Sequence, residues 1–208
     1  MVLEFFARGT LIGFAIAAPV GPIGLLVIRR TLSDGRTLGL LTGLGAATAD
    51  ALYGCVGAFG LTFISGVLLG YSFWTRLIGG LFLCWLGIST TRAKPDTEAA
   101  SASATKAASA YLSTMLLTLA NPATILSFAA VFAGFGLGTK GADYKTAAVI
   151  VAGVFTGSAL WWLLLSGGVS LVRHRLAPAT MRWINRGAGA FLLAFGIAAL
   201  VSLFWRPS

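Results

Sequence analysis

The chain has 208 residues, of which 57% are hydrophobic and only 10% are charged, and its net charge at pH 7 is +9. A soluble domain has about 25% charged residues, so a chain this apolar cannot cover a water-facing surface, and the composition excludes an ordinary soluble protein. Basic residues collect in the cytoplasmic loops of membrane proteins, so the positive charge indicates a lipid bilayer, and not nucleic acid, as the partner.

Six apolar runs follow one another along the chain, and each is long enough for a transmembrane helix of about 20 residues. Glu4 and Arg8, at the start of the first run, leave it without the basic flank of a signal peptide, so we expect an uncleaved span. A polar segment at about 92–110 separates the third run from the fourth and is predicted to be a flexible linker. The sequence therefore predicts an all-α, polytopic membrane protein with six transmembrane helices, at about 5–28, 38–62, 73–90, 111–135, 146–171 and 183–205.

Basic residues gather in two short segments between these runs. Arg29, Arg30 and Arg36 mark a basic loop after the first run, and a second basic loop lies at 173–182. If the N-terminus is outside, the inner loops hold twice as many Lys and Arg residues as the outer side. Since Lys and Arg favour the cytoplasmic side, we expect both termini to lie outside.

The two halves of the chain resemble each other in sequence. Residues 45–53 match residues 153–161, and residues 80–88 match residues 189–197, with Gly, Ala or Leu at several shared positions. Each half has three spans, and because three is an odd number, the second half enters the membrane from the opposite side. The sequence therefore predicts one transporter domain of two inverted three-helix repeats, at about 1–91 and 111–205, an architecture that many secondary transporters use.

Proline interrupts the first and fourth runs, which are equivalent in the two repeats. Pro19, Gly21 and Pro22 interrupt the first run, and Asn121 and Pro122 interrupt the fourth. Proline frees the carbonyl one turn earlier, and paired interruptions at corresponding positions indicate a transporter site. Freed carbonyls suit an ammonium group, and the amide N–H groups that start a half-helix suit a carboxylate. We therefore expect these residues to line the substrate pathway.

Asp50 is the one acidic residue that lies deep within an apolar run. A charged Asp at the centre of a membrane helix costs about 3 kcal/mol on insertion scales, so such a residue normally faces a cavity and takes part in transport. We hypothesise that Asp50 binds a proton, a substrate ammonium group, or both in turn; the alternative is a structural pair with a neighbouring span. Thr48, Thr156 and Ser158 are weaker candidates, because Ser and Thr often bond back to their own helix.

Several of these segments, in this order and spacing, are found in one known family. They are the Ala-Pro-Val-Gly-Pro segment at 18–22, Gly35-Arg36, Gly43-Leu-Gly45, the segment from Asp50 to Tyr53, Asn121-Pro122, Phe128 and the Phe-Ala-Gly-Phe segment at 132–135. Over nearly its whole length the chain resembles the lysine-exporter (LysE/RhtB) family of bacterial amino-acid efflux proteins.

The resemblance implies six helices in the bacterial inner membrane and export of amino acids or close derivatives, driven by the proton-motive force. Carried over position by position, it assigns the substrate pathway to Pro19, Gly21, Pro22, Asp50, Asn121 and Pro122. The chain departs from the family in two places: Pro-Val-Gly-Pro stands where Pro-Gly-Pro is common, and Ala123 stands where a Lys often follows Asn-Pro. A substrate copied from an exporter of basic amino acids is therefore not implied.

Two other functions remain open from the sequence. A divalent-cation exporter would need clusters of His, Asp or Glu in the spans, where only Asp50 is available. A membrane thiol–disulfide electron carrier would need cysteines paired across the two halves, whereas Cys55 and Cys84 both lie in the first half. The lone His174 has no neighbour at metal-ligand spacing. We expect no enzyme activity, no catalytic residues, no metal and no cofactor; a homodimer is compatible with the sequence.

Overall fold

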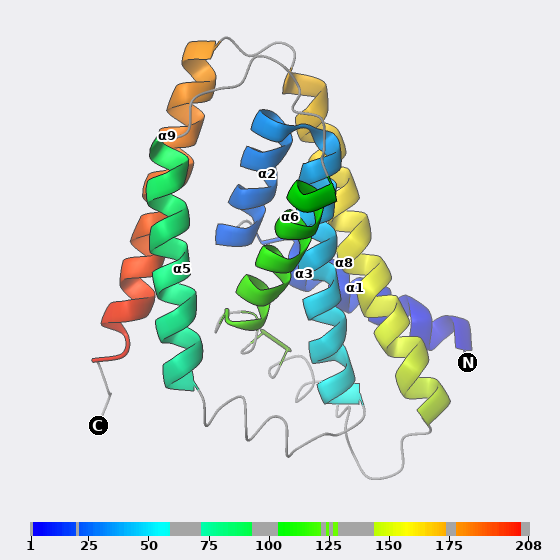
Figure 1. Cartoon of the computed structure of the whole chain (residues 1–208). Helices are drawn as coiled ribbons and strands as arrows, with labels where there is room; N and C mark the ends of the chain where they lie inside the picture. The colour runs from blue at the N-terminus through cyan, green and yellow to red at the C-terminus, as the bar shows by residue number, and fades with distance from the viewer. Residues whose placement is uncertain are drawn as a thin grey trace.

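The structure, a computed structural model, describes residues 2–19, 21–58, 72–92, 104–121, 124, 127–128, 144–173 and 178–204. Within these ranges the regular structure is helical, without a strand. The helices labelled in Figure 1 are α1 (Val2–Ala17), α2 (Pro22–Asp34), α3 (Arg36–Ala58), α5 (Ser72–Arg92), α6 (Ala104–Leu119), α8 (Tyr144–Arg173) and α9 (Pro178–Val201). The all-α prediction is therefore confirmed for the described part of the chain.

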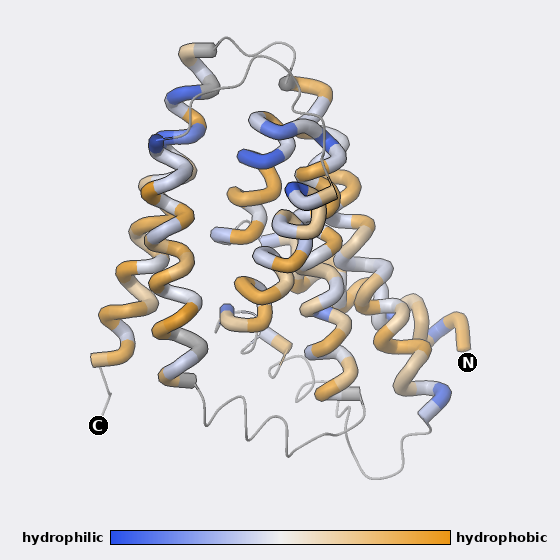
Figure 2. Tube along the Cα trace, in the orientation of Figure 1, coloured by the Kyte–Doolittle hydropathy of each residue, from blue (hydrophilic) through white to orange (hydrophobic). Residues whose placement is uncertain are grey.

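Apolar residues cover much of the length of these helices (Figure 2). Two stretches in the described residues, Tyr144–Val172 and Arg182–Val201, are each long and apolar enough to cross a bilayer. Helices α1 and α2 pass the same test together, as one span bent by 81°. The described part thus holds two or three candidate spans. The predicted runs at 38–62 and 111–135 extend into residues outside it, and the count of six spans stays a prediction.

Three segments predicted to be loops are partly helical, so these predictions were wrong. One is the basic loop at 173–182, where α9 begins at Pro178. Arg29 and Arg30 belong to α2, and α3 begins at Arg36, so that Gly35 alone separates the two helices. Gly35 has a φ of 100°, a conformation that glycine adopts without the clash of a Cβ. The predicted linker also ends early, because α6 begins at Ala104, in a stretch of Ala and Lys, which favour helices.

Arg30 holds three helices together near this turn. Its Nη1 donates to Thr42 Oγ1 of α3 at 3.1 Å and to the Ala110 carbonyl of α6 at 2.9 Å. Its Nη2 donates to Ser113 Oγ of α6 at 3.2 Å. Hydrogen bonds from a charged donor are stronger than neutral ones. Because the basic segment continues the helix, the guanidinium of Arg30 lies among these partners inside the bundle.

Helix α8 packs against both α1 and α3, while α6 packs along α3 and α5 packs along α9 (Figure 1). The α1–α8 contact is built on small residues. A Cβ on Gly13 would lie 2.8 Å from the carbonyl carbon of Val154, and a Cβ on Gly153 would lie 3.0 Å from the Cα of Gly9. Since membrane helices gain stability from such close backbone approach, the glycines allow α1 to lie directly on α8.

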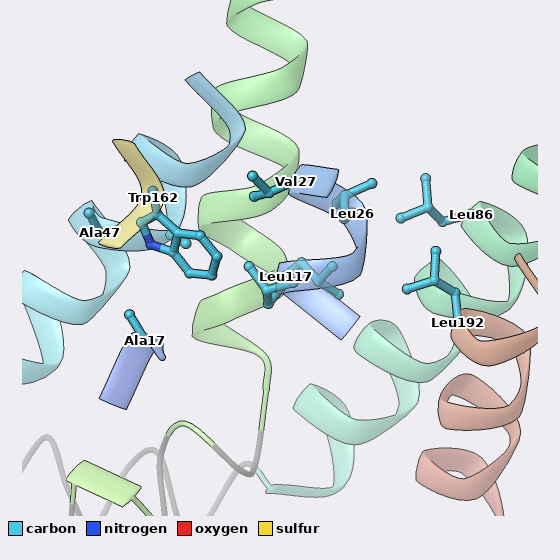
Figure 3. Packing of buried hydrophobic residues seen from close by; sticks show 10 residues of the cluster. Ala17, Leu26, Val27, Ala47, Leu86, Leu117, Trp162 and Leu192 are labelled. Carbon is cyan, nitrogen blue, oxygen red and sulfur yellow. The ribbon is translucent and has the colours of Figure 1, made fainter. Parts of the chain in front are cut away.

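The buried side chains form two clusters, and the larger one surrounds α2. Figure 3 shows Leu26 of α2 pointing toward Leu86 of α5 and Leu192 of α9, while Val27 points toward the side where Trp162 lies. The smaller cluster joins α1, α3 and α8 through Ile12, Tyr53, Phe128, Ile150 and Val154. Helix α2 therefore connects the α5–α9 pair to the rest of the bundle.

We predict that Gly157→Leu destabilises the protein and that Gly168→Leu on the same helix does not. A Cβ on Gly157 would lie 2.8 Å from the backbone nitrogen of Phe14 in α1, whereas a Cβ on Gly168 has no neighbour within 4 Å. Overpacking a close contact costs roughly 1–3 kcal/mol. Thermal unfolding of the purified proteins in detergent measures the difference, and equal melting temperatures would contradict the α1–α8 packing.

Candidate functional site

The break between α1 and α2 brings a helix start into the middle of the bundle. The last bond of the first helix runs from the Ala18 N–H to the Phe14 carbonyl, at 2.9 Å. Helix α2 begins at Pro22, and Gly21 before it supplies no side-chain cap. The first N–H groups of a helix have no partner within the helix, so the N–H groups of Ile23 and Gly24 carry the positive end of the α2 dipole.

The second interruption follows the end of α6 at Leu119. The Asn121 N–H donates to the Thr118 carbonyl at 3.1 Å, and the Asn121 carbonyl accepts from the Thr124 N–H at 3.1 Å. The backbone therefore turns at Asn121 and does not continue the helix. Pro122, which the sequence singled out, lies outside the described residues.

A cavity of about 280 Å³ lies between the two interruptions. This volume is close to the lower end of the range of about 300–1,000 Å³ that is usual for small-molecule sites. Helices α1, α2, α3, α6, α8 and α9 all contribute to its wall. Of the residues predicted for the pathway, those that line the cavity are Pro19, Gly21, Pro22, Asp50 and Asn121.

Asp50 is the acidic group of this cavity, and only 3% of its surface is exposed. Ser158 Oγ of α8 donates to Asp50 Oδ2 at 2.7 Å, and Trp162 Nε1 donates to Ser158 Oγ at 3.0 Å. Within the described residues no Lys or Arg forms an ion pair with Asp50. The carboxyl group is therefore held by a short line of neutral donors and faces the cavity without a counter-ion from that part of the chain.

Other polar side chains add hydrogen-bonding groups to the wall of the cavity. Thr118, Thr124 and Ser127 line it on the α6 side. Tyr53, one turn after Asp50, donates its hydroxyl to the Leu119 carbonyl and so ties α3 to the end of α6. The site thus combines one carboxyl group, several neutral hydrogen-bonding groups and the start of a helix.

The three weaker candidates have different surroundings. Thr48 Oγ1 shares a hydrogen bond of 2.6 Å with the Tyr111 hydroxyl, and Thr156 Oγ1 donates to the Ala152 carbonyl of its own helix at 2.7 Å. Neither Thr48 nor Thr156 lines the cavity. Ser158 does not line it either, but reaches it through its bond to Asp50.

Trp162 is a site residue that the sequence reasoning missed. It lines the cavity and donates to Ser158, which lies four residues earlier on the same helix. That spacing places both side chains on one face of α8, and this was the signal in the sequence that could have found it. Trp162 also packs in the larger core cluster (Figure 3).

In the described part of the chain no three His, Cys, Asp or Glu residues come together in a way that could hold a metal ion. Cys55 and Cys84 are free thiols on different helices, α3 and α5. What the cavity presents within the described residues is one carboxyl group and several neutral hydrogen-bonding groups.

An all-helical membrane protein whose helices break around a cavity with an acidic and several neutral polar side chains in its wall has the architecture of a transporter. The LysE type translocator family matches residues 14–203, and the chain belongs to this family. The resemblance stated from the sequence is thereby confirmed. Translocators of this family are transporters and not enzymes.

Several curated relatives cover most of the chain. The uncharacterized membrane protein YahN of Escherichia coli (strain K12) is 31% identical over 179 residues, which make up 83% of this chain and 78% of YahN. The threonine efflux protein of the same strain is 27% identical over 194 residues, or 90% of this chain and 93% of that protein. The threonine efflux protein of Salmonella typhi is 26% identical over 208 residues, covering 97% and 100% of the two chains. No solved structure matches the chain.

We predict that Ser158→Ala lowers the free energy of unfolding by about 1–3 kcal/mol, because Asp50 and Trp162 lose a buried partner. Thr156→Ala on the same helix removes a hydroxyl that bonds only within α8, and we expect a change below about 0.5 kcal/mol. Denaturant titrations of both variants in detergent measure the difference. Equal losses would mean that the Asp50–Ser158 bond does not stabilise the fold.

Proposed function

We propose that this protein is a secondary transporter that exports amino acids or close derivatives across the bacterial inner membrane in exchange for protons. The observation that carries the proposal is the position of Asp50, a buried carboxyl group on a cavity between two interrupted helices. Ionisable residues at membrane depth normally belong to a substrate or proton pathway. The family match and the amino-acid efflux named for the relatives support the same substrate class.

The cavity suits both charged ends of an amino acid. Asp50 offers a carboxylate for the substrate ammonium group. The free N–H groups of Ile23 and Gly24, at the start of α2, suit the substrate carboxylate, because a helix N-terminus binds anions. Asn121 can accept from one group and donate to the other. The ammonium group and the carboxylate of one zwitterion can therefore bind at different parts of the same cavity.

Asp50 also supplies the coupling to protons. A carboxylate without a counter-ion is costly inside a membrane protein. When the substrate ammonium leaves, a proton neutralises the same group in its place. Substrate and proton therefore exclude each other at Asp50, and one moves outward as the other moves inward.

Contacts between equivalent residues support six helices in two inverted repeats. In the sequence match, Gly80 corresponds to Gly189 and Gly87 to Gly196. A Cβ on Gly80 would lie 3.1 Å from the Gly196 carbonyl oxygen, and a Cβ on Gly189 would lie 2.6 Å from the Gly87 carbonyl oxygen. Elements related by a two-fold axis make contacts in such reciprocal pairs.

Asp50 and Ser158 fit the same symmetry. They are equivalent in the sequence match, and they bond to each other at 2.7 Å, as two residues on a two-fold axis would do. A transporter built in this way moves one repeat against the other around a fixed central site. The Asp50–Ser158 bond lies at that centre.

We predict that Asp50→Asn lowers amino-acid export by about tenfold or more, because a charged hydrogen bond worth at least ~1.4 kcal/mol to the substrate is lost. The measurement is efflux of labelled amino acids from cells that overexpress the protein, with and without a protonophore. Glu4→Gln is the matched control, since Glu4 is exposed and pairs with Arg8 on the surface of α1. An Asp50→Asn protein that inserts normally and exports at the wild-type rate would refute the proposal.

We also predict that both termini face the outside. The end of α2, the start of α3, the end of α5 and the start of α9 lie at one end of the bundle (Figure 1), and hydrophilic residues gather there (Figure 2). Basic residues favour the cytoplasmic side. A reporter enzyme that is active only outside the cytoplasm should therefore be active when fused to either terminus and inactive when inserted at about 95–100, and the reverse pattern would overturn this orientation.

A further inference from the structure

A second cavity lies beside the first, and its wall is almost entirely apolar. Its volume is about 160 Å³. It lies where α2 and the end of α6 face the α5–α9 pair. All of its lining residues belong to the described part of the chain, and Asn121 is the one residue among them with a polar side chain. The rest are glycines, prolines and hydrocarbon side chains, among them Gly80, Leu83, Leu117 and Ala199.

The two cavities share part of their walls. Pro22, Ile23, Asn121 and Phe195 line both of them. Asp50, Thr118, Thr124 and Ser127, by contrast, line the first cavity alone. The two cavities therefore adjoin at Ile23 and Asn121, and a small molecule that binds Asp50 with one end has an apolar space next to it.

The second cavity has the apolar wall that would suit the side chain of a transported amino acid. We infer that the second cavity binds the side chain of the exported amino acid, and that this protein is selective for apolar side chains of about the size of leucine. The inference rests on the proposed function and adds the substrate class to it. The head group of the substrate stays in the first cavity, at Asp50 and the start of α2.

The chemistry of the wall excludes other side chains. A lysine or arginine side chain would bring a charge into a space that has no carboxyl group, and burying an unpaired charge is costly. A threonine side chain would bring a hydroxyl that has only Asn121 as a partner and would leave much of the space empty. Each methylene that fills an apolar pocket favours its substrate by roughly 10-fold or more, so leucine and isoleucine fit this wall better than alanine or threonine.

The test uses purified wild-type protein in liposomes, with uptake of labelled leucine, isoleucine, phenylalanine, alanine, threonine and lysine in exchange for internal substrate. We expect leucine or isoleucine to be preferred over alanine by about a hundredfold or more, because each has three more side-chain carbon atoms than alanine, and lysine to be transported least. Preference for threonine or lysine would overturn the inference and leave the proposed function standing. Absence of exchange with every amino acid would instead count against the proposed function.

A pair of variants on α9 tests the location. Ala199→Phe places an aromatic ring in the second cavity, and Ala194→Phe adds the same ring at an exposed position that lines neither cavity. Ala199→Phe should lower leucine exchange by about tenfold and leave alanine exchange within about twofold, whereas Ala194→Phe should change neither.

Three outcomes of these variants would contradict the inference. They are an equal loss for leucine and alanine in a folded Ala199→Phe protein, an unchanged selectivity, and the same result for both variants. An unchanged selectivity is what a lipid chain in the second cavity would give. If Ala199→Phe does not fold, Gly79→Ala fills the same cavity with a single methyl group, and the smaller loss for leucine is measured against the same control.

Discussion

The line of hydrogen bonds from Trp162 through Ser158 to Asp50 is the interaction on which the rest of the structure depends. A carboxyl group at the depth of a bilayer must be satisfied by the protein, by water or by a ligand. Here α3 carries the acid and α8 carries the donors, so the two helices must pack in one register. That register leaves one side of Asp50 facing a cavity. The same bond that joins the two helices therefore holds the acid at the wall of the cavity.

Small residues make this register attainable. Where Gly9 and Gly13 of α1 lie on α8, there is no room for a Cβ, and the same is true of the α5–α9 pair at Gly87 and Gly196. In lipid the hydrophobic effect does not drive helices to associate, so their association depends on close van der Waals packing of the backbones. On either side of the break, α1 packs on α8, and α2 packs on α3 and α8, so both helices are fixed by the same neighbours.

In the proposed mechanism, the cavity at Asp50 binds the charged ends of the solute and the second cavity binds its side chain. Asp50 and the helix start of α2 provide charge, and the α5–α9 pair provides hydrocarbon. Helix α2 stands between them, with Leu26 toward the pair and Val27 toward Trp162 (Figure 3). A movement of α2 would therefore act on both cavities at once. Relatives named for threonine efflux are identical to this chain at only 26–27% of the aligned positions.

The sequence by itself determined the class of protein and the features that bilayer physics makes visible locally. Composition alone required a membrane protein, the prolines at 19 and 22 required a break, and Asp50 stood out because an acid in an apolar run is costly. Tertiary structure decided which residues, distant in the chain, contact these features. Ser158 lies 108 positions from Asp50, and no local pattern encodes that distance. Likewise Arg30 extends α2 because it finds partners on α3 and α6, and the second cavity arises only where α5 and α9 come to face α2. Periodicity and composition indicate the secondary structure and the environment that a segment prefers. A binding site, by contrast, is formed by segments that are distant in the chain and that only tertiary packing brings together.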